Sequence, residues 1–93
     1  MDSPTLSIIV SNYNHAKYLP CFFQSILNQS YQPKEIIIID DASTDNSVEI
    51  IEEFASKNPI VKFVRNQTNQ KPIICYYQIG WELATGDYIF FRE

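Results

Sequence analysis

Short apolar runs recur at four places along the chain. Leu6 to Ser11 is rich in β-branched residues, Glu35 to Asp40 carries four consecutive isoleucines, and Ile60 to Val64 and Asp87 to Phe91 are further short apolar segments. Runs of this length and composition predict β-strands. The uninterrupted isoleucines favour a strand that is covered on both faces, as in a parallel sheet.

Segments with apolar residues at helical spacing separate these runs. The spacing predicts one helix between Leu19 and Leu27 and a second between Val48 and Ala55. Asn66 to Pro72 is polar and predicts a loop. Ile73 to Ala84 predicts a third helix that stops near Gly86, because glycine commonly ends helices.

The order of these elements is β-α-β-α-β-α-β, with four strands and three helices. Strict alternation implies right-handed crossovers, an open parallel α/β sheet and helices on both of its faces. The length of 93 residues fits a single domain spanning residues 1–93. The aromatic side chains near the C-terminus are expected in the core or on a covering face: Tyr76, Tyr77, Trp81, Phe90 and Phe91.

Composition and charge exclude several classes of function. The net charge is -4 and only 7 scattered Lys and Arg residues occur, which argues against nucleic acid as a partner. The only glycines, Gly80 and Gly86, form no glycine-rich phosphate loop.

Location is inferred from the same composition. The cysteines, Cys21 and Cys75, lack metal-ligand spacing and fit a reducing compartment. The N-terminus has no signal-peptide pattern, and the longest apolar run, Ile36 to Ile39, is too short to cross a bilayer. The expectation is a cytoplasmic protein with no membrane-spanning segment.

Polar residues follow the first two predicted strands directly. Ligands of open parallel sheets bind at the carboxyl ends of strands. Ser11, Tyr13 and Asn14 lie at the first end, and Asp40 and Asp41 lie at the second. The carboxylates can accept hydrogen bonds from a base imide or ribose hydroxyls, and a tyrosine ring offers a flat surface for a base. These five residues are the candidate ligand site.

A structural interpretation of the same residues stays open. Asp41, Ser43 and Asp45 are also good helix caps for the segment that follows them, and Tyr13 and Asn14 suit a turn. His15 is the lone histidine of the chain. Such a histidine is more often a surface residue, or one satisfied by hydrogen bonds within the protein, than a catalyst.

Five segments together resemble family-2 glycosyltransferases. Ser7 to Leu19 resembles their opening strand and loop, Ser25 to Tyr31 the end of their first helix, and Glu35 to Ser47 their strand with an acidic pair. Asn69-Gln70 and Ile79 to Ile89 resemble their third helix and fourth strand. The match covers nearly the whole chain, with several motifs in the right order.

The resemblance implies a Rossmann-like sheet that forms the N-terminal part of a GT-A fold. It implies an enzyme that transfers a sugar from a nucleotide diphosphate sugar, with a UDP-sugar favoured, to an acceptor. Ser11, Tyr13, Asn14, Asp40 and Asp41 would then line the nucleotide pocket. A divalent metal, Mg or Mn, is expected in the complete enzyme and none in this chain alone, because the family's metal motif and catalytic base lie at or beyond the end of this sequence. The chain alone is expected to be inactive.

Two other classes of function compete with this interpretation. A non-catalytic nucleotide-binding or self-associating module is the main alternative, because the apolar Phe90-Phe91 end offers an uncovered edge for a homo-oligomer. A phosphoacceptor receiver domain is disfavoured, since its acidic pair usually follows the first strand and the present pair follows the second.

Overall fold

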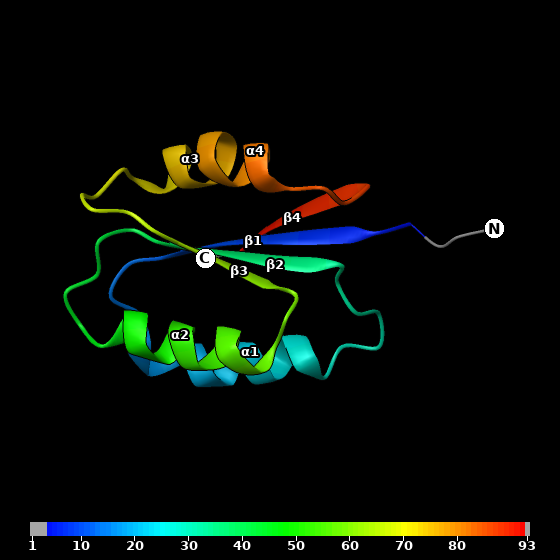
Figure 1. Ribbon diagram of the computed structural model, residues 1–93, viewed down its shortest axis with the longest axis horizontal. Coiled ribbons are helices and arrows are strands. Elements are labelled where there is room, and N and C mark those ends of the chain that lie inside the picture. The colour runs from blue at the N-terminus through cyan, green and yellow to red at the C-terminus, as the bar shows by residue number, and fades with distance from the viewer. Residues whose placement is uncertain (1–3, 93) are drawn as a thin grey trace.

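Four parallel strands form one sheet in the order β3-β2-β1-β4 (Figure 1). In the computed structural model, which describes residues 4–92, the strands are β1 (Leu6–Asn12), β2 (Glu35–Asp40), β3 (Val61–Arg65) and β4 (Tyr88–Arg92). The predicted strands and their parallel arrangement are therefore confirmed, and no observed strand end differs from the predicted one by more than one residue. Residues 1–3, which belong to the segment in which no signal-peptide pattern was predicted, lie outside the described part of the chain.

Two helices cover one face of the sheet. A single 3-10 turn, η1 (Ala16–Tyr18), leads into α1 (Leu19–Leu27), and α2 (Ser47–Lys57) lies beside it below the sheet in Figure 1. Pro20 stands in the first turn of α1, where its missing N–H costs no helical hydrogen bond. The rings of Phe23 and Phe54 stack at 3.9 Å between centroids and join the two helices.

The opposite face carries one helical segment in three stretches. These are α3 (Pro72–Ile74), the π-helical η2 (Cys75–Gly80) and α4 (Trp81–Leu83), which lie above the sheet in Figure 1. The third helix was thus predicted at the right place, but the π-helical geometry of its middle stretch was not predicted. Gly80 makes the close packing possible, because a Cβ there would lie 2.5 Å from Cγ2 of Ile9 on β1.

The isoleucines of β2 divide between the two faces. Ile36 and Ile38 pack in the cluster between the sheet and helices α1 and α2. Ile37 and Ile39 pack with Cys75 and Tyr76 on the other face of the sheet. All four are 0% exposed. Each such side chain contributes roughly 1.5–3 kcal/mol on burial, so this strand anchors both layers.

The third helix ends at Leu83, close to the predicted stop near Gly86, although neither glycine has a positive φ. Gly86 packs against β1, with its N–H 2.8 Å from Oγ of Ser7. One sequence-based expectation was wrong. Of the C-terminal aromatics only Tyr76 is buried, and Tyr77, Trp81 and Phe90 are exposed, because the sheet has no covering layer beyond β4 in the described residues. No helix within residues 4–92 has the length and apolar character needed to cross a membrane.

Candidate functional site

The strand order reverses at β1. From β1 the chain proceeds to β2 and then β3 on one side, and it returns to place β4 on the other side of β1. The connecting helices change face at the same point (Figure 1). Ligands of open α/β sheets bind outside the carboxyl ends of the strands at such a switch point. The end of β1, with Ser11 and Tyr13, is therefore the candidate position for a ligand.

A buried carboxylate ties the ends of β1 and β2 together. Asn12 pairs with Asp40 across the two strands, and its Nδ2 donates a hydrogen bond of 2.9 Å to Oδ1 of Asp40. Ser43 donates to the same carboxylate from its N–H at 3.0 Å and from its hydroxyl at 2.7 Å. Asp40 is 0% exposed. Asn12 was missed in the sequence analysis, because its role depends on a partner 28 residues away.

Asn14 interlocks the loops that follow the two strands. Its backbone has a φ of 57°, a left-handed conformation that asparagine tolerates better than most residues. Its Oδ1 accepts the N–H groups of Thr44 at 2.7 Å and Asp45 at 3.2 Å, and its own N–H donates to Oγ of Ser43 at 3.0 Å. The two polar strand ends therefore form one rigid unit.

The Asp41 carboxylate holds the loop between β3 and α3. It accepts the N–H of Gln70 at 2.7 Å, Nδ2 of Asn66 at 3.0 Å and the N–H of Lys71 at 3.0 Å. Burial acts to raise the pKa of Asp41, but these donors outweigh it and hold the pKa below its usual value. Lys71 has a φ of 74° and a ψ of 153°, a region used almost only by glycine. Asp41 is 1% exposed, because the loop between β3 and α3 covers its carboxylate.

Helix capping accounts for Asp45 but not for the acidic pair. Asp45 accepts the N–H of Ser47, the first residue of α2, at 2.9 Å, and it also accepts the N–H of Ala16 at 3.1 Å. Neither Asp41 nor Ser43 bonds to the start of α2 through a hydrogen bond present in residues 4–92. The capping alternative therefore holds for one of its three residues.

Open space beside the site lies at the end of β1. Ser11, Tyr13, His15 and Pro72 line a hollow of about 140 Å³. Tyr13 is 46% exposed, whereas Ser11 is 9% exposed at the floor. Of the five predicted residues, Ser11 and Tyr13 border this hollow, while Asn14, Asp40 and Asp41 hold the surrounding loops. His15 and Pro72 were not selected from the sequence; the position of His15 directly after Tyr13-Asn14 was the available signal.

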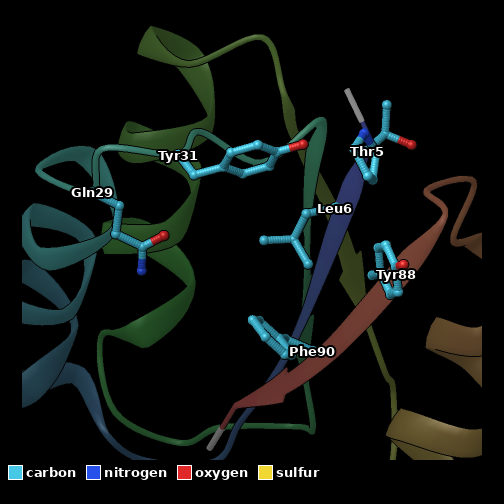
Figure 2. Close-up of a pocket in the computed structure, with 7 residues that line it drawn as sticks. Thr5, Leu6, Gln29, Tyr31, Tyr88 and Phe90 are labelled. Atoms are coloured by element: carbon cyan, nitrogen blue, oxygen red, sulfur yellow. The ribbon is translucent and has the colours of Figure 1, made fainter. Parts of the chain in front are cut away.

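Two larger hollows lie elsewhere in the described residues. One, of about 410 Å³, lies at the amino ends of β1 and β4 and is lined mostly by apolar groups. Figure 2 shows Leu6, Tyr88 and Phe90 on the strands facing Tyr31 from the segment after α1. Within residues 4–92 no group of three or more His, Cys, Asp or Glu side chains is placed to hold a metal ion.

The sequence matches one protein-family model over residues 7–92, that of "Glycosyl transferase family 2". A glycosyltransferase of Haemophilus influenzae, described as uncharacterized, is 48% identical over 93 residues, which are 100% of this chain and 37% of that protein. The chain thus spans about a third of the length of this relative.

Solved structures show the same fold. The mannosyltransferase PcManGT from Pyrobaculum calidifontis, in complex with GDP-Man and Mn²⁺, superposes with a TM-score of 0.84 at 23% identity, over 96% of this chain and 27% of that one. Residues 1–349 of S. aureus TarS, in complex with UDP, superpose with a TM-score of 0.81 at 28% identity, over 95% of this chain and 26% of that one. The predicted N-terminal, Rossmann-like part of a GT-A fold is therefore confirmed.

Proposed function

This chain belongs to glycosyl transferase family 2, and on that premise we propose that it forms the nucleotide-binding part of an enzyme that transfers a sugar from a nucleotide diphosphate sugar. The chain spans 37% of the Haemophilus influenzae relative, so we assign the transfer step, the acceptor and a divalent metal ion to a longer protein. The described residues offer no cluster that fits such a metal.

One observation carries the proposal. The interlocked ends of β1 and β2 stand at the switch point of the sheet, and Tyr13, which is 46% exposed, borders a hollow there. An exposed aromatic ring over such a floor suits a nucleobase, which stacks on either face of a ring. Ser11 contributes a hydroxyl at the floor.

The three remaining predicted residues have supporting parts in this proposal. Asn14 and Asp40 fix the loops that border the hollow. Asp41 fixes the loop between β3 and α3, which also borders the hollow, by accepting the N–H groups of Gln70 and Lys71.

Uridine diphosphate is the first ligand to test, since TarS was solved with UDP. We expect the chain to bind UDP, and we expect Tyr13→Ala to weaken binding by roughly 5- to 150-fold, the effect of about 1–3 kcal/mol of base stacking. Tyr18→Ala is the matched control, because Tyr18 is exposed and does not line the hollow. Isothermal titration calorimetry with UDP and GDP measures both affinity and base preference. The proposal would be overturned if the wild type bound neither UDP nor GDP, or if Tyr13→Ala and Tyr18→Ala lost the same affinity.

A second candidate function is self-association through β4. β4 is an edge strand of the described sheet, and Tyr88 and Phe90 on it are 62% and 60% exposed beside the apolar hollow of about 410 Å³ (Figure 2). The other edge, β3, is protected by exposed charges on Lys62 and Arg65. We propose a second copy of this chain as the occupant of the β4 edge, with the strands paired.

Sedimentation velocity over a hundredfold range of concentration tests this second candidate. We expect a dimer that Phe90→Lys converts to a monomer. Ile73→Lys is the matched control, because Ile73 is 66% exposed on the helical face and lies away from β4. A strict monomer, or a dimer that Phe90→Lys leaves intact, would rule out pairing at this edge.

A further inference from the structure

The hollow at the end of β1 is too small for a complete nucleotide diphosphate. Its volume is about 140 Å³, whereas pockets that enclose small ligands span roughly 300–1,000 Å³. A nucleotide that seats its base against Tyr13 therefore leaves its phosphates at the rim. The groups at that rim decide how the charged end of the ligand is held.

His15 is the lining residue suited to a phosphate. Ser11 and Tyr13 bring neutral hydroxyls and Pro72 brings an apolar ring, whereas an imidazole can carry positive charge and then donates from both nitrogens. Within residues 4–92 the imidazole of His15 makes no hydrogen bond, and its one ring neighbour is Tyr18, with centroids 6.3 Å apart. The side chain is exposed and borders the hollow.

The nearby carboxylates are already satisfied by the protein. Asp40 and Asp41 are buried and accept internal hydrogen bonds on the β2 side of the site. Asp45 is bonded to Ser47 and to the N–H of Ala16. An anion on the β2 side of the hollow would face these carboxylates. An anion beside His15, at the start of η1, would instead meet an imidazole that makes no hydrogen bond within residues 4–92. Charge therefore favours the His15 side of the rim.

We infer that the His15 imidazole donates a hydrogen bond to a phosphate group of the bound nucleotide, and this inference rests on the proposed function. His15 is thus a ligand-binding residue that adds affinity for the diphosphate without touching the base.

A ligand series separates the phosphate contribution from the base contribution. Binding of uridine, UMP and UDP is measured by isothermal titration calorimetry for the wild type, His15→Ala, His15→Arg and Lys17→Gln. We expect His15→Ala to weaken UDP binding about tenfold, the effect of one lost hydrogen bond to a charged group, and to leave uridine binding unchanged. His15→Arg should restore most of the UDP affinity because a guanidinium also donates hydrogen bonds to a phosphate.

Lys17→Gln controls for general electrostatics. Lys17 is an exposed cation two residues away that does not line the hollow, so its loss should change UDP affinity less than twofold. Equal losses in His15→Ala and Lys17→Gln, or a ratio of UDP to uridine affinity that His15→Ala leaves unchanged, would overturn the inference alone. Failure of the wild type to bind uridine, UMP and UDP would instead overturn the proposed function and the inference with it. Thermal unfolding of each variant verifies the fold.

Discussion

Glu35 makes the strongest polar cluster outside the candidate site. It is the first residue of β2 and is 2% exposed. Its carboxylate accepts hydrogen bonds from Nζ of Lys62 on β3, from the hydroxyl of Ser7 on β1, and from the N–H of Thr85 at 2.6 Å before β4. One buried carboxylate thus joins all four strands at their amino ends.

The size of its contribution follows from the pKa. Burial acts to raise the pKa of Glu35, but the bonds from Lys62, Ser7 and Thr85 outweigh it and lower the pKa from 4.5 to about 2. At 1.36 kcal/mol for each factor of ten, this difference corresponds to about 3 kcal/mol of folding free energy. Because the folded pKa is depressed, the contribution is complete above about pH 5 and is lost as the pH falls toward about 2.

Glu35→Gln tests this account. The amide cannot be ionised, and its NH₂ group faces donors, so we expect a loss of about 3 kcal/mol in the free energy of unfolding at pH 7. Urea unfolding followed by circular dichroism at pH 7, 5, 4 and 3 measures the difference between the wild type and the variant. That difference should shrink as the pH falls, because only the wild type loses the charge.

Two further variants control the experiment. Glu52→Gln changes an exposed carboxylate on α2 and should alter stability by less than about 0.5 kcal/mol. Lys62→Met removes a half-exposed cation and should cost about 1 kcal/mol, which keeps a folded protein available if Glu35→Gln unfolds. A loss below about 1 kcal/mol for Glu35→Gln at pH 7, or a difference that is constant from pH 7 to 3, would refute the reasoning.

Three other outcomes are expected. Gly80→Ala places a Cβ 2.5 Å from Ile9 and should lower the free energy of unfolding by about 1–3 kcal/mol in urea titrations, and an unchanged midpoint would contradict the packing. Cys21 is exposed, whereas Cys75 is buried and burial raises the pKa of its thiol. A thiol reagent should therefore modify Cys21 rapidly in the folded protein and Cys75 only in denaturant. Asn14→Ala removes the loop bonds and strains a φ of 57°, so it should cost about 1–2 kcal/mol and weaken UDP binding, whereas Asn14→Asp keeps the acceptor and should cost less.

The elements of the fold follow from local sequence patterns. Four isoleucines in a row between Glu35 and Asp40 predict a doubly covered strand without knowledge of its neighbours, because continuous apolar character already implies two covering layers. The same local signal identified the polar ends of β1 and β2, and motif resemblance identified the family. The π-helical middle of the third helix was not predicted, nor was the close approach of Gly80 to Ile9, which joins residues far apart in the sequence.

The sequence alone determined which residues stand at the ends of β1 and β2, since strand length and chain order fix those positions. Only the tertiary structure decided which of them are open: Tyr13 borders space, while Asp41 is closed off by donors from Asn66, Gln70 and Lys71. It also decided that Glu35, apparently one end of an apolar strand, is a buried anchor. The physical reason is the same in both cases. A side chain's exposure and charge depend on hydrogen-bond partners that lie 25 to 50 residues away in sequence, and no local pattern encodes which partners folding brings to it.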